Sequence, residues 1–549
     1  PQSPNYYIKF RTYYNFIKQN NKKLLIFLNM IDEQSQTSRF SFYFLDEGEM
    51  YIKEFVGLCN FLYPESNKIE ELKGNVHFCS NSIIFEPDSH DYSIVKFHFK
   101  YFQNRPKIQN ITDKEMFNFT INKIICIKPP PIYESYKIFN LTSEIYLNFE
   151  FEKLESVAEV VFELIDKYNY KQNNFEFDSI DFLGTLYTFQ FDYSLFKKQN
   201  EKCLIKKELI VKQLIPLIEI PGMLMMTNER IYFQPVFDFY SKKIITIRIN
   251  RITKYYKRKI AEGNKGLEIC AFSKKGKQKN IFLTFENEYS RNIIYELIKN
   301  NVNKDVETNF SLEKYTQLWI EGGISNFEYL TILNSAAERT KNNLSQYPVF
   351  PWVLSNYYSE NLDLTDINNY RDLSKPIGAL NPTRLKSLLE RYKEMPEPKY
   401  LYGTHYSNPS YVIGYLVREK PEYMLKLQSG KLDKPDRIYF SVQKDWDNCN
   451  TVSFNELIPE FYEENIEFLC NFKNIKFENN SKNENIENVI LPRWALNPKD
   501  FLDKMRNALE SDYVNNNLNV WIDLIFGYKQ RGEEAIKNFN CKFCYFLFL

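Results

Sequence analysis

The first half of the chain is built from short runs in which apolar and polar residues alternate. Polar turns such as that at Pro87 and Asp88 separate the first runs, which lie at residues 39–44, 76–79, 82–85 and 95–99. Further runs follow at residues 207–213, 222–227, 230–234, 243–249, 266–272 and 280–284. A period of two in segments rich in aromatic and β-branched residues predicts antiparallel strands. We therefore expect two β-rich modules in this half.

Each set of predicted strands is followed by a segment with helical spacing. Residues 152–168 place Val157, Val161 and Leu164 on one face, and residues 288–299 do the same with Ile294 and Ile298. A recurrence at three and four residues predicts an amphipathic helix. Strands followed by one terminal helix is the order of a pleckstrin-homology or GRAM barrel, although other small β-barrels share that order.

The second half of the chain has a different pattern, and all five Trp residues lie beyond residue 300. Ser325 and Glu328 form a capping box, and Asn-Pro pairs at residues 381–382 and 497–498 supply a cap and a first-turn Pro. We expect these helices to bury the following apolar residues: Phe327, Leu330 and Ala337; Leu385, Leu388, Leu389 and Tyr392; and Phe501, Met505, Ala508 and Leu509. Long Pro- and aromatic-rich stretches without a period lie between them. The whole pattern predicts a multidomain α+β chain whose last domain is irregular and largely helical.

Composition narrows the choice of partners and compartment. The 71 Lys and Arg against 70 Asp and Glu give a formal charge of +1, so no global field recruits nucleic acid or a membrane. No run reaches the roughly 18–20 apolar residues that cross a bilayer. Nine scattered Cys residues without regular spacing are typical of reduced thiols. We expect a cytoplasmic protein with peripheral contact to membranes and no nucleic-acid partner.

The irregular second half carries the strongest motif signal in the chain. Seven blocks follow one another in order: GISNFEYL (323–330), LSQYPVFPWVL (344–354), YRDLSKPIGALNP (370–382), YGTHYS (402–407), GKLDKPDR (430–437), ELIPEF (456–461) and WIDLIFGYKQRG (521–532). This series closely resembles the BEACH domain family. The resemblance implies a non-catalytic adaptor in membrane trafficking or receptor-proximal signalling, with a pleckstrin-homology-like module packed on the BEACH domain.

Within the family, residues 39–51 resemble the entry to the GRAM-like module of FAN-type members, which also carry a WD-repeat propeller. The blocks end near residues 531–535 and residues 541–549 do not resemble the family's continuation, so we expect an incomplete BEACH domain without the propeller. The expected division is as follows: residues 1–170, a region with a GRAM or pleckstrin-homology-like module; 171–200, a linker; 201–300, a second pleckstrin-homology-like module; 301–309, a linker; and 310–549, the BEACH domain.

A basic run between residues 242 and 279 is the first candidate binding site. Thirteen Lys and Arg residues stand there against two acidic residues, and five of them are candidates for a lipid headgroup: Arg251, Lys254, Lys257, Arg258 and Lys259. Clustered cations on a β-module can hold phosphoinositides through charge-assisted contacts. The alternative, which we favour, is a solvated face that docks on acidic parts of the BEACH domain.

Charged residues beside apolar anchors form the second candidate, a partner-binding groove: Arg371, Asp372, Lys375, His405, Asp436 and Arg437. Buried ion pairs and side-chain caps are the simpler explanation, because irregular backbone leaves polar groups that only side chains can satisfy. We expect both interpretations to hold, with structure the larger share.

No catalytic constellation emerges from the sequence. His405 has Ser407 nearby but neither an orienting acid nor an oxyanion hole, so a structural His is the better interpretation. Cys541 and Cys544 lack a second pair, and the Gly430-Lys431 step lacks the other parts of a phosphate loop. We expect no metal, no cofactor and no enzymatic activity. A scaffold at membranes is the primary hypothesis, a phosphoinositide sensor acting through the β-modules the alternative, and an uncharacterised enzyme the least favoured.

Overall fold

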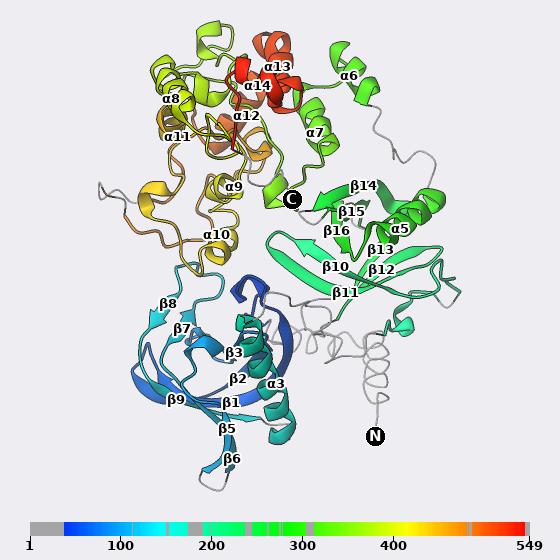
Figure 1. Ribbon diagram of the computed structural model, residues 1–549, viewed down its shortest axis with the longest axis vertical. Helices are drawn as coiled ribbons and strands as arrows, with labels where there is room; N and C mark the ends of the chain where they lie inside the picture. Colours follow the sequence, from blue (N-terminus) through cyan, green and yellow to red (C-terminus); the bar gives the residue numbers. More distant parts are fainter. Residues whose placement is uncertain are drawn as a thin grey trace, which may run out of the picture.

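The computed structural model describes residues 38–111, 114–149, 153–173, 190–198, 200–236, 244–260, 263–273, 276, 278–302, 312–479, 481 and 486–543. Three units follow along the chain: a first module (residues 38–173), a second module (190–302) and a helical region (312–543). In Figure 1 the first module lies at the bottom and the helical region at the top, with the second module between them on the right. Residues 303–309 of the linker predicted at 301–309, and residues 174–189 and 199 of the linker predicted at 171–200, lie outside the described residues.

The first module is an antiparallel sheet with the strand order β5-β6-β9-β1-β2-β3-β4-β7-β8. Its long hairpin alternates buried and exposed residues, as expected of a sheet that covers a core on one face. Helix α3 (Leu154–Asn173) packs against β5 and β6. The strands are β1 Tyr51–Tyr63, β2 Lys68–Cys79, β3 Ser82–Pro87, β4 Ile94–His98, β5 Lys107–Ile111, β6 Lys114–Ile121, β7 Ile124–Ile127, β8 Lys137–Phe139 and β9 Ser143–Phe149.

The second module is a smaller antiparallel sheet with the order β13-β12-β11-β10-β16-β15-β14. Helix α5 (Glu288–Asn301) packs against β15 and β16. Its strands are β10 Leu209–Ile215, β11 Ile218–Met226, β12 Arg230–Pro235, β13 Ile245–Arg248, β14 Ile252–Ile260, β15 Gly263–Phe272 and β16 Gln278–Phe285. In both modules the end strands of the described sheet are not paired with each other.

The helical region packs short helices and irregular segments around an aromatic core, in which Trp352 and Trp521 are fully buried. Its helices are α6 Leu312–Ile320, α7 Asn326–Ala336, α8 Pro382–Glu394, α9 Pro409–Tyr415, α10 Pro421–Leu427, α11 Val442–Thr451, α12 Pro498–Leu509, α13 Asp512–Ile525 and α14 Gly532–Lys537. The 3-10 turns are η1 Phe42–Phe44, η2 Phe99–Tyr101, η3 Tyr193–Leu195, η4 Ile249–Arg251, η5 Leu344–Gln346, η6 Ile367–Asn369, η7 Ile377–Ala379, η8 Pro435–Arg437, η9 Pro459–Tyr462 and η10 Tyr528–Gln530. The predicted fold class, two β-rich modules followed by a largely helical domain, is confirmed.

Local signals in the sequence located the helix starts well. Ser325 and Glu328 form the reciprocal capping box at α7, and Asn381 and Asn497 cap α8 and α12 through their side chains. The expected burial is confirmed for α12, but it is wrong for α8, in which no residue is fully buried. The predicted burial of Ala337 is also wrong, because this residue is the exposed C-cap of α7.

Two segments differ from the predicted strands for physical reasons. Residues 39–44 were expected to form a strand, but Ser41 caps the 3-10 turn η1, which buries Phe42 and Phe44 together. Strand β14 was missed, because its Lys and Arg residues indicated a solvated run rather than a sheet edge. In fact β14 repeats buried, intermediate and exposed positions, with Tyr255 and Arg258 among the buried ones.

Candidate functional site

A buried ion pair inside the second module also binds the helical region. Arg258 on β14 donates from Nε to Glu268 Oε2 on β15, over 2.8 Å. The same guanidinium reaches out of the module to Ser335, near the end of α7, donating to its carbonyl oxygen over 2.8 Å and to its hydroxyl over 3.2 Å. Arg258 is 4% exposed, so its charge is satisfied inside this contact rather than by solvent.

Glu268, the other member of the pair, also binds the helical region. We call the contacts between the second module and the helical region the second joint, and those between the first module and the helical region the first joint. The Oε1 atom of Glu268 accepts hydrogen bonds from Thr340 Oγ1 over 2.8 Å and from Asn342 Nδ2 over 2.9 Å. The backbone N–H of Lys259 donates to Glu338 Oε2 over 2.9 Å. One carboxylate therefore binds both the arginine of its own module and the turn that follows α7.

The first module is joined to the helical region mainly by backbone groups. Tyr136 N–H donates to the Gly430 carbonyl over 2.6 Å, and Leu432 N–H donates to Ser135 Oγ over 2.9 Å. A third bond runs from Lys476 N–H to the Tyr133 carbonyl over 3.0 Å. This first joint therefore uses the motif at residues 430–437 as a docking loop.

Gly430 fits that loop because of its conformation. Its φ is +84°, which disfavours residues with a Cβ. A Cβ at this position would lie 2.1 Å from Cδ2 of Tyr136, so the ring of the first module packs directly over the glycine. In Figure 1, β8, which follows Tyr136, lies below and to the left of α10, which precedes the loop.

All three units meet at Tyr43 of η1. Its hydroxyl donates to the Pro216 carbonyl in the β10–β11 turn over 3.2 Å. Its ring lies 5.8 Å from that of Tyr423 on α10, measured between centroids. Next to it, Lys426 Nζ donates to the Leu45 carbonyl over 2.8 Å. Tyr43 thus contacts the second module and the helical region at once.

The predicted groove residues do not share one surface. Arg371 is 1% exposed and binds both carboxylate oxygens of Glu456, over 2.8 and 2.9 Å. Trp521 Nε1 donates to the same carboxylate over 3.2 Å. Arg371 is therefore committed to the core. Asp372 and Lys375 form a partly exposed ion pair at 3.0 Å beside it.

Two further residues of that set, Asp436 and Arg437, lie in the docking loop of the first joint. Asp436 accepts from Ser481 Oγ over 2.8 Å, and Arg437 pairs with Asp433 at 2.6 Å with a largely exposed side chain. These contacts involve elements different from those around Arg371. The structure therefore does not unite the set into a single groove through any contact among the described residues.

His405 has the surroundings of a structural residue. Its Nδ1 accepts the Ser407 N–H over 3.2 Å, and its ring packs on Tyr406. Burial, together with the nearby charges of Lys542 and Arg339, lowers the pKa of His405 well below its usual value. A neutral imidazole that accepts a backbone bond matches the hydrogen-bonded structural His expected from the sequence.

The five lipid candidates are distributed over different environments. Arg258 and the Lys259 backbone belong to the second joint, as described above. Lys254 and Lys257 are exposed on β14, where Lys257 Nζ lies 4.5 Å from the centre of the Tyr295 ring. Arg251 alone turns toward a cleft on another side of the module.

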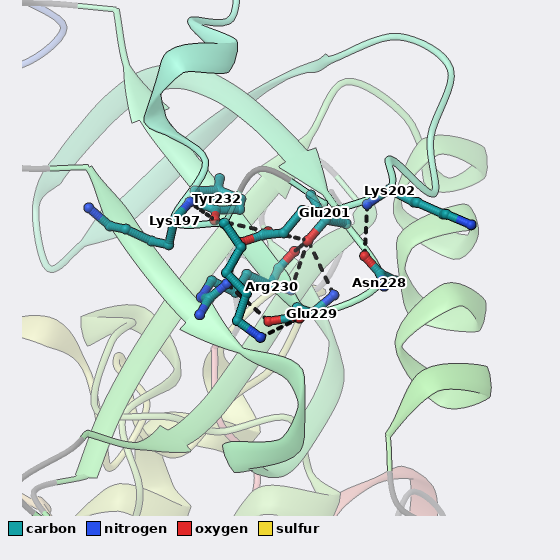
Figure 2. A network of polar contacts seen from close by, with 9 residues as sticks. Lys197, Glu201, Lys202, Asn228, Glu229, Arg230 and Tyr232 are labelled. Carbon is teal, nitrogen blue, oxygen red and sulfur yellow. Dashed lines mark hydrogen bonds and ion pairs between the residues drawn. The ribbon is translucent and has the colours of Figure 1, made fainter.

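That cleft was missed from the sequence, because its residues come from distant segments. It has a volume of about 520 Å³ and is lined by six basic residues, namely Lys197, Lys198, Arg230, Arg248, Arg251 and Lys279. Figure 2 shows the polar network beside it, in which buried Glu201 binds Arg230 and the Tyr232 hydroxyl. No motif links residues 197–201 to β12 in advance.

The part of the chain that the structure describes contains no group of three or more His, Cys, Asp or Glu residues placed to hold a metal ion. Over the same residues, no helix combines the length and the apolar character needed to cross a bilayer. Cys544, the second residue of the Cys pair noted in the sequence, lies outside the described residues.

Comparison with known families assigns two of the three units. Residues 317–548 match the family model described as Beige/BEACH domain, and residues 27–174 match that described as FAN protein N-terminal PH domain. This chain is a BEACH-domain protein. The helical region is its BEACH domain, and the first module is its FAN-type PH domain. The match runs to residue 548, so the expectation that the resemblance stops near residue 535 is wrong.

Curated relatives point the same way. A neurobeachin homolog of Caenorhabditis briggsae is 36% identical over 60% of this chain and 14% of its own length. BEACH domain-containing protein lvsD of Dictyostelium discoideum is 48% identical over 41% of this chain and 8% of its own. A neurobeachin homolog of Caenorhabditis elegans is 47% identical over 40% of this chain and 9% of its own. The chain thus spans only a small part of these relatives.

Among solved structures, the C-terminal domain of an unknown protein from Leishmania infantum aligns with 18% of this chain and 84% of its own. The identity is 19% and the TM-score 0.15.

Proposed function

We propose that this chain is a non-enzymatic adaptor that gathers proteins at membranes in trafficking or receptor-proximal signalling. In this role the BEACH domain and the two β-modules act as one platform that partners bind. The chain works in the cytoplasm and contacts membranes peripherally. The proposed division is residues 1–170, 201–300 and 310–549 for the three units, with linkers at 171–200 and 301–309.

The observation that carries this proposal is the pair of joints between the units. Both modules contact the BEACH domain through hydrogen bonds that satisfy buried or backbone polar groups, and Tyr43 contacts all three units. Separating the units would leave the buried polar groups of these contacts without partners, which costs free energy, so the contacts favour a fixed arrangement of the units. A fixed arrangement presents composite surfaces, which is what an adaptor needs.

The charged groups first considered for chemistry support the same function. Arg371 and Glu456 bind each other in the core, and His405 accepts a backbone bond. These groups position the irregular backbone of the BEACH domain. An enzyme would instead need a nucleophile or base facing a substrate site.

Capture and titration test the proposal. The full chain, immobilised and cross-linked in cell extract, should yield a partner that rebinds saturably when purified. A variant with both joints weakened, Glu268→Gln/Gly430→Ala, should bind a partner that spans two units at least about tenfold more weakly, a loss of about 1.4 kcal/mol. Circular dichroism of the variant controls for its folding.

Two outcomes would overturn the adaptor function. One is that no captured protein rebinds saturably to the folded chain. The other is catalytic turnover of a small molecule by the purified chain, because that result would support the alternative of an enzyme with an unrecognised site.

A further inference from the structure

A small cavity inside the BEACH domain is lined by residues from four of the seven sequence blocks. The blocks at residues 370–382, 402–407, 456–461 and 521–532 each contribute to its wall, together with Asn540. The cavity has a volume of about 10 Å³. No lining residue takes part in either joint, so the cavity belongs to the domain itself.

Two polar atoms of the lining residues have no hydrogen-bond partner among the described protein atoms. They are the hydroxyl of Tyr402 and the side-chain carbonyl oxygen of Asn540, Oδ1. Both residues are only 2% exposed, so bulk solvent does not reach these atoms. Leaving a buried donor and a buried acceptor unpaired costs free energy, and the two atoms therefore indicate a site for a bound polar molecule.

Hydrogen bonds fix the orientation of the Asn540 amide. Its Nδ2 donates to the carbonyl oxygens of Leu524 and Lys529, over 2.8 Å in each case. Turning the amide around would bring Oδ1 against these two carbonyl oxygens, which cannot donate. Oδ1 therefore remains an acceptor that needs a donor from another group.

Packing holds the Tyr402 hydroxyl in place. A Cβ at Gly378 would lie 2.3 Å from Cε1 of Tyr402, so the tyrosine ring lies directly against that glycine. The Phe454 ring packs on it with 5.0 Å between the centroids. Burial raises the pKa of Tyr402 above its usual value, despite the nearby charge of Arg384. The hydroxyl therefore stays protonated and can donate a hydrogen bond.

The charges around the cavity favour a neutral ligand. Each carboxylate oxygen of Glu456 accepts two hydrogen bonds, one of them from Arg371, so this charge is already matched. A further cation would be repelled by Arg371 and by Lys542, which lines the cavity. An anion would be repelled by Glu456 and by the Asn540 carbonyl oxygen.

We propose that this cavity binds one water molecule, which accepts a hydrogen bond from Tyr402 Oη and donates one to Asn540 Oδ1. A single buried water requires a cavity of roughly 10–15 Å³, and water can donate and accept at the same time. Backbone bonds already join the same two segments, because Leu401 and Tyr402 donate to the Cys541 carbonyl. The water extends this contact into the core of the domain.

Urea unfolding of the full chain tests the energetic contribution of the water. Trp fluorescence reports on the BEACH domain, because all five Trp residues lie beyond residue 300. Tyr402→Phe removes the group that donates to the water, so it should lower the ratio of folded to unfolded protein about fivefold.

Tyr357→Phe is the matched control. Tyr357 is fully buried in the same domain, its hydroxyl has no hydrogen-bond partner among the described protein atoms, and it does not line the cavity. Removing this hydroxyl breaks no hydrogen bond, so the ratio of folded to unfolded protein should stay the same or rise.

A crystal structure of the full chain, at a resolution that shows ordered water, tests the geometry directly. We expect a density peak at about 2.5–3.0 Å from both Tyr402 Oη and Asn540 Oδ1. Absence of this peak overturns the proposal, as does a loss of stability in Tyr402→Phe no larger than that in Tyr357→Phe. If Tyr402→Phe fails to fold by circular dichroism, the peak in the wild-type crystal structure decides the question alone.

Discussion

The two joints that hold the β-modules on the BEACH domain are built from different chemistry. The first relies on backbone bonds of Tyr136, Leu432 and Lys476, whereas the second concentrates on one buried pair, Arg258 and Glu268. Removing one partner of a buried ion pair leaves an uncompensated charge, but backbone bonds survive most side-chain changes. A single substitution in the ion pair should therefore disrupt the second joint. The first joint should be disrupted only by a substitution that changes the conformation of the docking loop.

The largest effect is expected from Glu268→Gln. This change leaves the Arg258 guanidinium buried without its carboxylate, and it weakens the bonds from Thr340 and Asn342. Losing one partner of such a pair costs about 3–5 kcal/mol. Calorimetric unfolding of the full chain should show the second module melting separately and earlier.

Glu219→Gln in the same module is the matched control, because Glu219 is exposed and pairs with Lys212 at the surface. It should cost less than about 1 kcal/mol. Equal destabilisation by the two variants would remove the contrast between the joints.

Gly430→Ala should destabilise the first joint by about 2–3 kcal/mol, because the new side chain combines a strained positive φ with a clash against the Tyr136 ring. Hydrogen exchange at the Leu432 amide should accelerate, while exchange at the Lys259 amide stays unchanged. Gly414→Ala, on a helix with nothing within 4 Å of the new Cβ, is the control and should not affect either joint. Acceleration at both amides would show that the joints are not independent.

A change of pH separates the BEACH domain from the joints. Burial raises the pKa of Asp445 from 3.8 to about 6, against the opposing hydrogen bonds of Tyr415 and Asn455. The folded state thus binds this proton more tightly than the unfolded state, so stability rises as pH falls from above 6 toward 4. Urea unfolding should show a gain of about 2 kcal/mol from this group, allowing for its partial exposure.

Asp445→Asn should abolish that contribution, and both Glu268→Gln and Gly430→Ala should retain it, because Asp445 belongs to neither joint. A pH response that disappears in a joint variant would place its origin at the joint instead.

The smallest effect is expected from Ser135→Ala, which removes the hydroxyl that accepts the Leu432 N–H. The main-chain bonds of Tyr136 and Lys476 remain, so the loss should be about 1 kcal/mol. Chemical denaturation measures it, with Ser66→Ala on an exposed turn of the same module as the control. A loss as large as that of Gly430→Ala would mean that one side chain dominates the first joint.

Sequence reasoning succeeded where the cause is local. Ser325, Asn381 and Asn497 were placed correctly because a cap depends on residues within one turn. The motif blocks led to the BEACH domain for a similar reason, since their order is written along the chain. Arg258 of the basic run contacts the BEACH domain at Ser335, which is not an acidic residue as expected.

Sequence reasoning failed where the interacting residues come from distant segments of the chain. The acid that neutralises Arg258 is Glu268 of its own module, rather than an acidic face of the BEACH domain. The block at residues 430–437 drew attention through Asp436 and Arg437, but its contacts to the first module come from the Gly430 carbonyl and the Leu432 amide. Backbone groups carry no residue-type signal, so only the fold could reveal them.

The central claim, that both modules are docked on the BEACH domain, is tested most directly by hydrogen exchange of the full chain. The amides to follow are those of Tyr136, Leu432, Lys476 and Lys259, each of which donates across a joint. We predict that all four are protected well above the rates of an unfolded chain. Exchange at unfolded-chain rates at these amides, while that of Leu224 within the second sheet stays slow, would contradict the account.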